Sequence, residues 1–234
     1  MHIKDAVVLV TGANRGLGRA WASLLLQAGA RKVYACARDA STVDLPGVIA
    51  LELDITQPDQ VARAAAQCSD VTLLINNAGI VRGGDLLAED APARAQEELD
   101  TNLFGTLAMC RAFAPVLRAN GGGAIVNVLS VLSWISIPGG GTYAASKAAT
   151  WSMTNGVRHA LKGQGTQVVG VHVAFMDTDM TAGVDAPKAS PSDVVAQAIA
   201  AIEAGAEEVL ADEPTRQVKR GLSAERGIYL DAPG

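Results

Sequence analysis

The sequence predicts an α/β fold built on one doubly wound parallel sheet of about seven strands, with helices on both faces. Two observations point to this fold. Short runs rich in Val, Ile and Leu show no polar alternation, which is typical of strands covered on both sides. Amphipathic stretches alternate with these runs along the chain, as in parallel sheets whose strands are joined by helices.

The predicted elements form a single domain spanning residues 1–234, because no repeat, low-complexity segment or linker divides them. Pro58, Pro92 and Pro191 stand where the first turn of a helix accepts a proline. Pro115 is expected to bend or end the long helix that contains it. We expect strands at 7–10, 32–37, 48–51, 71–75, 124–128, 167–173 and 208–211, and helices near 17–28, 58–68, 91–118, 143–162 and 191–204.

Composition excludes several classes of partner. The net charge is −5, and Lys and Arg are scattered, so there is no basic stripe for a nucleic acid. No apolar run approaches the roughly 18 to 20 residues of a membrane span. We therefore expect no nucleic-acid partner and no membrane partner.

Cysteine usage indicates a cytoplasmic protein without a metal site. Cys36, Cys68 and Cys110 are odd in number and far apart, which fits free thiols in a reducing compartment, and they show no metal-ligand spacing. The chain passes from Met1 almost directly into the first strand, so no signal peptide is expected. The three isolated histidines, His2, His159 and His172, are expected to be structural or exposed.

A glycine-rich loop follows the first predicted strand and opens a helix. Its glycines let the backbone turn sharply and let a pyrophosphate approach, and the helix N-terminus offers free N–H groups to the anion. The alternative is an ordinary strand–helix turn, which the position after the first strand disfavours. The loop predicts a dinucleotide site that includes Gly12, Asn14, Arg15, Gly16, Leu17 and Gly18.

Tyr143 and Lys147 are four residues apart, with Ser130 upstream. Four residues are just over one helical turn, so both side chains are expected on one helix face. An ammonium beside a phenol favours phenolate and lowers the pKa of the tyrosine. The serine can hydrogen-bond the same substrate oxygen. Taken alone, the pair also fits a solvated helix.

Together, five motifs resemble the short-chain dehydrogenase/reductase family. They are the loop T-G-x-x-x-G-x-G, Asn76-Asn77-Ala78-Gly79, Asn102, Ser130 and Tyr143-x-x-x-Lys147, in the family's order and intervals. The resemblance runs from about residue 5 to residue 212. It implies a Rossmann fold that carries a nicotinamide dinucleotide across the carboxyl ends of the strands.

The resemblance and the charges predict NADP(H) as the cofactor. Family members that select NAD carry an acidic residue at the end of the second strand, where this chain has Ala37. Arg38 and Arg15 can instead clasp a 2′-phosphate with charge-assisted bonds. In the alternative, Arg38 is a solvated surface residue and Asp39 holds the ribose of NAD.

The resemblance assigns further cofactor contacts. Asp54 and Ile55 correspond to the adenine site, with a helix N-cap as the alternative for Asp54. Family residues at the positions of Met176 and Thr178 hold the carboxamide, although Val173-Ala174 replaces the usual Pro-Gly before them. The cleft lining is assigned to Asn77, Ala78 and Gly79, for which a structural turn is the alternative.

The resemblance also assigns the reaction. Tyr143 would act as general acid in reduction and general base in oxidation. Lys147 would lower its pKa and, like Tyr143, contact the cofactor, while Ser130 would polarise the substrate oxygen. Asn102 would hold a water on a proton path, with a backbone contact at a helix kink as its alternative.

Apolar residues near the predicted cleft favour a small-molecule substrate that is an apolar ketone or aldehyde, or a secondary alcohol. A short lid at about 176–190 suggests an open pocket for bulky substrates. Trp134 fits the core equally well. The predicted substrate contacts are Ser130, Leu132, Trp134, Tyr143, Phe175 and Met180.

Three other functions fit parts of the sequence, and the resemblance also implies an oligomer. The alternatives are an NAD-dependent alcohol dehydrogenase, a non-catalytic NADP-binding sensor and, least favoured for lack of a larger substrate domain, a sugar-nucleotide epimerase. By resemblance, helices 91–118 and 143–162 would form a homodimer or homotetramer. The tail 213–234 does not resemble the usual family ending.

Overall fold

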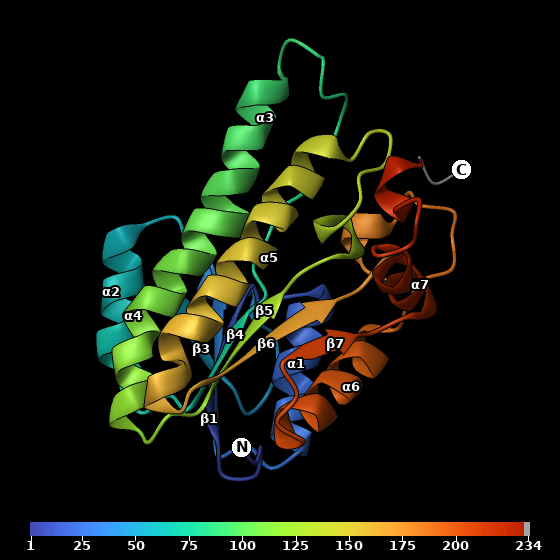
Figure 1. The fold of residues 1–234 in the computed structure, drawn as a ribbon. Helices are drawn as coiled ribbons and strands as arrows, with labels where there is room; N and C mark the ends of the chain where they lie inside the picture. The colour runs from blue at the N-terminus through green and yellow to red at the C-terminus, as the bar shows by residue number, and fades with distance from the viewer. Residues whose placement is uncertain (232–234) are drawn as a thin grey trace.

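The structure, a computed structural model, describes residues 1–231. Across these residues, seven parallel strands form one sheet in the order β3-β2-β1-β4-β5-β6-β7 (Figure 1). This confirms the predicted fold class. The strands are β1 (Val7–Thr11), β2 (Lys32–Ala37), β3 (Ile49–Glu52), β4 (Leu73–Asn76), β5 (Ala124–Val128), β6 (Gln167–His172) and β7 (Glu208–Leu210).

Helices cover both faces of the sheet. Helix α1 (Gly16–Gln27) packs against α6 (Pro191–Glu203) on one face. The opposite face carries α2 (Pro58–Gln67), α4 (Thr106–Ala119) and α5 (Gly141–Leu161). The predicted ends of these strands and helices agree with the structure to within two residues, apart from the helix predicted at 91–118.

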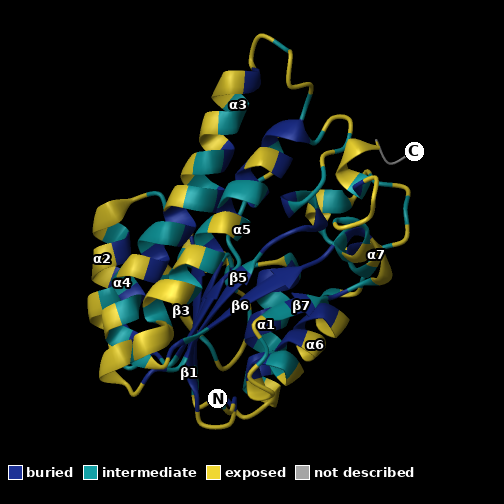
Figure 2. Cartoon of the chain, in the orientation of Figure 1, coloured by how far each residue is buried: buried dark blue, intermediate teal, exposed yellow. Residues whose placement is uncertain are grey.

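The strands are apolar without alternation because two cores share them. In β1, Val8 and Val10 pack into the core beneath α1 and α6, whereas Val7 and Leu9 pack beneath α2 and α4. Figure 2 shows the central strands as buried. The strand β3 departs from the expected burial, since it lies at the sheet edge and Ile49 is 43% exposed.

The helix predicted at 91–118 is interrupted, and the interruption is not at Pro115. A π-helical segment (Leu99–Gly105) separates α3 (Ala91–Glu98) from α4, which contains Pro115 in its interior. Gly105 lets the end of this segment pack against Ile55, because a Cβ there would lie 2.7 Å from the Cγ1 atom of Ile55. The wider turn brings Asn102 into the protein interior, where it is 1% exposed.

The tail forms a helix that packs back on the domain. Helix α7 (Glu213–Gly221) begins at Asp212, whose Oδ1 accepts a hydrogen bond of 2.9 Å from the Thr215 amide. Asp212 Oδ2 accepts a second bond of 2.8 Å from the Ala174 amide after β6. Residues 232–234 of the predicted tail lie outside the described residues. Within residues 1–231, every helix is too short or too polar to cross a membrane.

The strand order fixes where a ligand site can form. The chain adds β2 and β3 on one side of β1 and then crosses to add β4 through β7 on the other. In parallel sheets, ligands bind beyond the carboxyl ends of the strands at such a reversal. The glycine loop after β1 and the segment 77–79 after β4 lie at this point.

Candidate active site

The glycine loop keeps its backbone clear for an anion. Gly12 and Gly16 have positive φ angles of 64° and 51°. A Cβ on Gly18 would lie 2.0 Å from the Gly12 carbonyl oxygen. Leu17 is buried in the core, while the N-cap Arg15 makes no side-chain hydrogen bond to the backbone at the start of α1. This geometry fits a dinucleotide phosphate at the helix N-terminus.

The segment after β4 is hydrogen-bonded to this glycine loop. The Asn77 side-chain amide donates to the carbonyl oxygens of Thr11 and Gly12 at 2.9 and 3.1 Å. The Thr11 hydroxyl accepts the amides of Asn77 and Ala78, both at 3.0 Å. Asn77 thus ties the two loops at the strand-order reversal together. Thr11 begins the T-G-x-x-x-G-x-G motif, but its bonds to the segment after β4 were not predicted from the sequence.

A cleft of about 600 Å³ lies beyond β2 and β3 and brings together Arg38, Asp54 and Ile55. Asp54 holds its own turn, since its Oδ1 accepts the Thr56 amide at 2.9 Å and the Thr56 hydroxyl at 2.8 Å. The N-cap of α2 is Gln57, so Asp54 is not the cap that the sequence left open.

The polar residues expected to choose between NADP and NAD differ in whether they already make hydrogen bonds or ion pairs. Asp39 Oδ1 accepts the amide and the hydroxyl of Ser41 at 2.9 and 2.6 Å, which lowers the pKa of the Asp39 carboxyl. Arg38 is exposed. Arg15 pairs with Asp179 at 3.2 Å, and both side chains are more than 70% exposed. Asn14 donates to Thr42 at 3.1 Å, beside the same turn.

Ser130, Tyr143 and Lys147 come together at the ends of β5 and the start of α5. Ser130 begins a short turn, and its hydroxyl accepts the Leu132 amide at 3.1 Å. The Lys147 ammonium donates to the Val128 carbonyl at 3.0 Å and lies 5.7 Å from the centre of the Tyr143 ring. Tyr143 and Lys147 therefore lie on one face of α5, and this face is turned toward the carboxyl end of β5.

The pKa values differ from the sequence expectation. Burial is the largest cause that raises the pKa of Tyr143 above its usual value; the Ser130 hydroxyl lowers it, and the Glu98 carboxylate raises it further. Burial lowers the pKa of Lys147 to about 8. Lys147 was expected to depress the tyrosine pKa, but in the protein alone the loss of hydration around the phenol outweighs any such effect.

The side chain of Asn102, in the π-helical segment, is hydrogen-bonded to the backbone of Ile80 and to the Ser146 hydroxyl. Its Oδ1 accepts the Ile80 amide at 2.9 Å, and its Nδ2 donates to the Ile80 carbonyl at 3.0 Å and to Ser146 at 2.9 Å. A Cβ on Gly79 would lie 3.1 Å from Asn102 Oδ1 and 3.7 Å from Lys147 Nζ. Asn102, Gly79 and Lys147 therefore meet beyond the carboxyl ends of β4 and β5.

A buried polar row beneath these residues was missed in the sequence. Thr150 donates to the Asn102 carbonyl at 3.1 Å, and Asn127 of β5 donates to Thr154 at 2.9 Å. Ser146, Thr150 and Thr154 recur every four residues along α5, so their spacing was the available signal. This row fixes α5 against β5 and the π-helical segment.

The predicted lid is closed at its base. Met176 and Ala189 form an isolated parallel bridge, and Ala189 donates its amide to the Phe175 carbonyl at 2.8 Å. Thr178 reaches across to the glycine loop, where a Cβ on Gly16 would lie 3.3 Å from its methyl group. The lid therefore lies against the loop that opens α1.

The predicted substrate contacts divide by exposure. Leu132 and Phe175 are half-buried, and Met180 on the lid is 57% exposed. The Trp134 ring instead stacks on His172, with ring centres 3.9 Å apart and planes at 19°. Packing therefore accounts for Trp134 without a substrate, while the contacts of the other three remain predictions.

The comparisons with known proteins agree with this geometry. Residues 6–189 match the family model for short chain dehydrogenases. A bovine protein, dehydrogenase/reductase SDR family member 7B, is 31% identical over 77% of this chain and 61% of its own length. The chain thus spans about three fifths of that relative.

Two solved structures resemble the whole chain. A short chain dehydrogenase from Burkholderia cenocepacia in complex with NADP is 43% identical, with a TM-score of 0.92 over 97% of this chain and 96% of that one. A short chain dehydrogenase/reductase from Burkholderia phymatum in complex with NAD is 25% identical, with a TM-score of 0.87 over 100% and 99%. The chain therefore belongs to the short-chain dehydrogenase/reductase family and is an oxidoreductase of that family.

Proposed function

We propose that this protein is an NADPH-dependent oxidoreductase that reduces an apolar ketone or aldehyde, or oxidises a secondary alcohol in the reverse direction. The observation that carries the proposal is the convergence of Ser130, Tyr143 and Lys147 beyond the carboxyl end of β5, next to Gly79. When bound, the nicotinamide supplies or accepts the hydride. The chain itself has to position the substrate oxygen and move one proton.

Tyr143 is the proposed proton donor in reduction and acceptor in oxidation. Ser130 would donate a hydrogen bond to the substrate oxygen, since its own oxygen already accepts the Leu132 amide. The Lys147 ammonium would stabilise negative charge that develops on the phenol during transfer. Asn102 holds the backbone beside Lys147, which supports its proposed place on a path for the proton.

NADPH is the proposed cofactor because the charges favour a phosphate. Arg38 is exposed at the cleft, Arg15 is exposed in the glycine loop, and Ala37 puts no carboxylate at the end of β2. Asp39, the alternative ligand for the ribose of NAD, already accepts two hydrogen bonds within its own turn. The NADP complex of the Burkholderia cenocepacia relative supports the same choice, and the NAD complex of the Burkholderia phymatum relative keeps NAD as the alternative.

Cofactor choice can be tested by one matched pair of variants. Arg38→Ala should weaken NADPH binding about 10- to 100-fold, because it removes a charge-assisted hydrogen bond, and should leave NADH binding unchanged. Arg31→Ala is the control, since Arg31 is also exposed but precedes β2 at the other end of the sheet. Cofactor fluorescence gives both affinities. Unchanged discrimination in Arg38→Ala would disprove the NADPH proposal.

A panel of ketones and aldehydes tests the activity itself. NADPH should be oxidised with apolar carbonyl compounds, and bulky ones should be accepted beneath the short lid. Binding of NADPH without turnover of any panel member would favour the non-catalytic sensor. A preference limited to small aliphatic aldehydes would contradict the open pocket.

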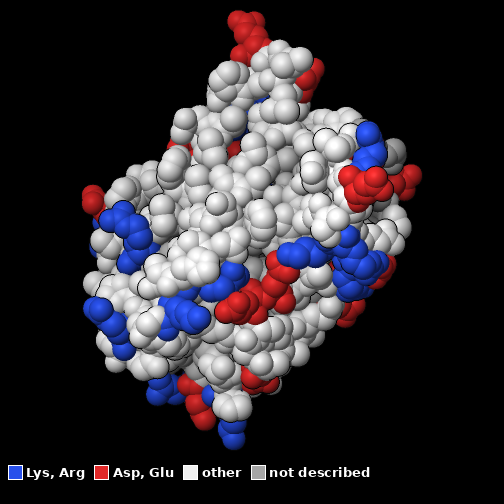
Figure 3. Space-filling model, in the orientation of Figure 1, with Lys and Arg blue, Asp and Glu red and all other residues white. Residues whose placement is uncertain are grey.

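The proposed assembly is a homodimer or homotetramer that works in the cytoplasm. From Gly141 to Val157, the sequence of α5 has a single charged residue, Lys147, which is buried. In Figure 3, the upper part of the molecular surface that is turned toward the viewer, where Figure 1 shows α5, is largely uncharged. Light scattering would test the assembly. The three free, buried cysteines are compatible with a reducing compartment.

A further inference from the structure

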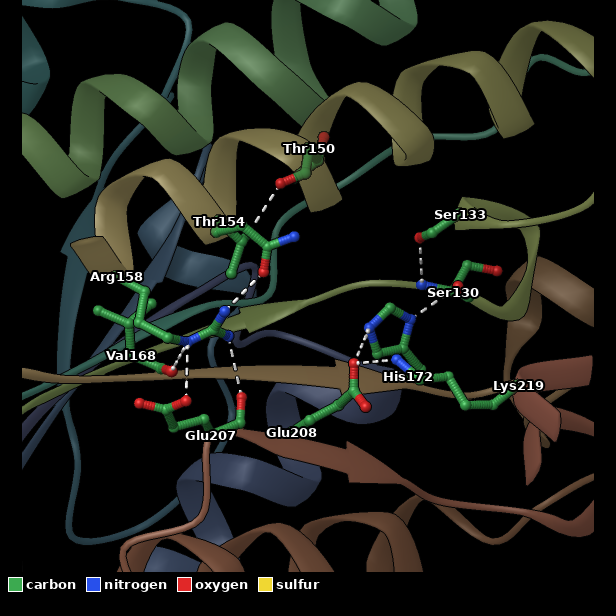
Figure 4. Close-up of polar contacts among 11 residues, drawn as sticks. Ser130, Ser133, Thr150, Thr154, Arg158, Val168, His172, Glu207, Glu208 and Lys219 are labelled. Atoms are coloured by element: carbon green, nitrogen blue, oxygen red, sulfur yellow. Dashed lines mark hydrogen bonds and ion pairs between the residues drawn. The ribbon is translucent and has the colours of Figure 1, made fainter. Parts of the chain in front are cut away.

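His172 lies directly behind the turn that carries Ser130. It ends β6 and is 1% exposed. Its Nδ1 lies 3.1 Å from the Ser130 carbonyl oxygen. Because a carbonyl oxygen only accepts hydrogen bonds, Nδ1 must carry the hydrogen, which fixes the tautomer of the ring. The imidazole therefore anchors the backbone of Ser130 from inside the protein (Figure 4).

The same ring anchors the other end of this turn. Trp134 stands four residues after Ser130, and its ring stacks on the imidazole at 3.9 Å. Within the turn, the Ser130 hydroxyl accepts the Leu132 amide, and the Ser133 hydroxyl accepts the Ser130 amide at 3.3 Å. His172 thus holds both ends of a turn whose interior is already hydrogen-bonded.

The C-terminal helix reaches the imidazole from the opposite side. Lys219 of α7 lies 4.8 Å from the centre of the Trp134 ring and donates to Glu208 Oε1 at 2.9 Å. The same Glu208 oxygen is 3.7 Å from His172 Nε2, which is buried without a hydrogen-bond partner among residues 1–231. In Figure 4, Lys219 and Glu208 converge on the imidazole. Helix α7 is thereby connected to the Ser130 turn through Trp134, which contacts both Lys219 and His172.

We propose that His172 is a positioning residue that holds the Ser130 turn in its working geometry, and that α7 supports it through the contact of Lys219 with Trp134. The inference rests on the proposed role of Ser130. His172 does not touch the substrate in this arrangement. It orients the backbone from which the Ser130 hydroxyl projects, so its loss should lower turnover more than cofactor binding.

The charge state of the ring agrees with this arrangement. Burial lowers the pKa of His172 to about 4, the Ser130 carbonyl and Glu208 raise it, and Lys219 and Lys147 lower it. The ring is therefore neutral at neutral pH, with hydrogen on Nδ1. Because Lys219 and Glu208 pair with each other, neither charge is left to draw the ring away from Ser130.

Two substitutions separate the hydrogen bond from the ring. His172→Phe keeps a ring for Trp134 but removes the imidazole donor to the Ser130 carbonyl, which then accepts only the Ser133 amide at 3.0 Å. We expect kcat to fall about tenfold with an unchanged dissociation constant for NADPH. His172→Asn can still donate to that carbonyl and should recover most of the lost kcat. Equal losses in both variants, or a kcat for His172→Phe within twofold of the unsubstituted protein, would overturn the positioning role.

The contribution of α7 has its own matched pair. Lys219→Met keeps the length of the side chain over Trp134 but removes the charge, and should lower kcat about two- to fivefold. Arg220→Met removes the next charge of α7, which pairs with Glu213 on the surface, and should leave kcat unchanged. Equal kcat values for the two variants would overturn the connection through the tail.

Hydrogen exchange provides a readout that does not need turnover. The amides of the Ser130–Trp134 turn should exchange about tenfold faster in His172→Phe than in the unsubstituted protein, while those of α1 should not change. If no carbonyl compound is reduced by the unsubstituted protein, the proposed function fails, and faster exchange would still support the anchoring of this turn. Unchanged exchange in the turn would overturn the inference whether or not the protein is active.

Discussion

The two ends of the proposed cofactor site are built in opposite ways. At the catalytic end, Asn102 and Lys147 are buried, and their polar atoms are fixed by backbone groups of Ile80 and Val128. At the phosphate end, Arg15 and Arg38 are exposed, and the one ion pair made by Arg15 is a surface contact.

The difference separates two kinds of task. Proton transfer demands groups that stay in place before the substrate arrives, so the catalytic end is preorganised by buried hydrogen bonds. Recognition of a phosphate can rest on exposed, mobile guanidiniums that order when the ligand binds. Substitutions at the catalytic end should therefore change turnover or stability, and those at the phosphate end should change affinity alone.

Tyr143→Phe is expected to have the largest effect. It removes the proposed proton donor, and kcat/KM should fall about 10²- to 10⁴-fold. NADPH affinity should stay within about threefold, because the phenol oxygen is one of many proposed cofactor contacts. Steady-state kinetics and fluorescence titration measure the two quantities. If NADPH affinity fell by as large a factor as kcat/KM, the catalytic end would not differ from the phosphate end in its role.

Asn102→Leu tests whether the buried framework also stabilises the fold. The substitution leaves the Ile80 amide and carbonyl without their side-chain partners, so the free energy of unfolding should fall by about 2 to 4 kcal/mol. Denaturant titration measures the change. Asn14→Leu at the phosphate end is the control and should cost less than about 1 kcal/mol, because its bond to Thr42 is exposed. Equal costs would contradict the comparison.

Glu98→Gln tests the electrostatics of the catalytic end. Glu98 is fully buried, and its Oε1 accepts the amides of Arg82 and Gly83 at 2.6 and 3.1 Å. Its charge raises the pKa of Tyr143. Glutamine keeps an acceptor for both amides but removes the charge, so the Tyr143 pKa should fall.

The fall in the Tyr143 pKa should shift the pH dependence of alcohol oxidation. Oxidation needs the phenolate, so its rate rises with pH up to the tyrosine pKa, and a lower pKa moves that rise to lower pH. The measurement is the pH profile of kcat/KM. Glu97→Gln is the matched control, since Glu97 pairs with Arg82 on the surface and should leave the profile unchanged. A profile for Glu98→Gln that does not move would rule out the electrostatic coupling.

The sequence predicted those features that depend on neighbours along the chain. Gly12, Gly16 and Gly18 follow from a local turn, and Tyr143 and Lys147 from one helical turn. His172 was expected to be structural or exposed because it is isolated in the sequence; its contacts come from Ser130, 42 positions before it, from Trp134, and from Glu208, 36 positions after it. Nothing local marks a histidine that stacks on Trp134.

Burial was also hidden from the sequence. Glu98 follows the exposed Glu97 at the end of α3, and its carboxylate is buried against the amides of Arg82 and Gly83, which precede it by 16 and 15 residues. Burial of the phenol is the largest cause that raises the pKa of Tyr143, and Glu98 raises it further, whereas a spacing argument considers only the neighbouring Lys147. Local patterns thus predicted which groups meet, and the tertiary structure decides their charge.

Asp179→Asn is expected to have the smallest effect and tests the phosphate end most directly. Asp179 on the lid pairs with Arg15 at 3.2 Å, and exposed pairs of this kind contribute about 0 to 1 kcal/mol. Its removal should free Arg15 for a 2′-phosphate, so NADPH affinity should rise about two- to fivefold with kcat unchanged. Asp177→Asn, another exposed lid residue, is the control and should change neither quantity. If affinity for NADH rose equally, the effect would be a loosened lid and not a guanidinium released for phosphate.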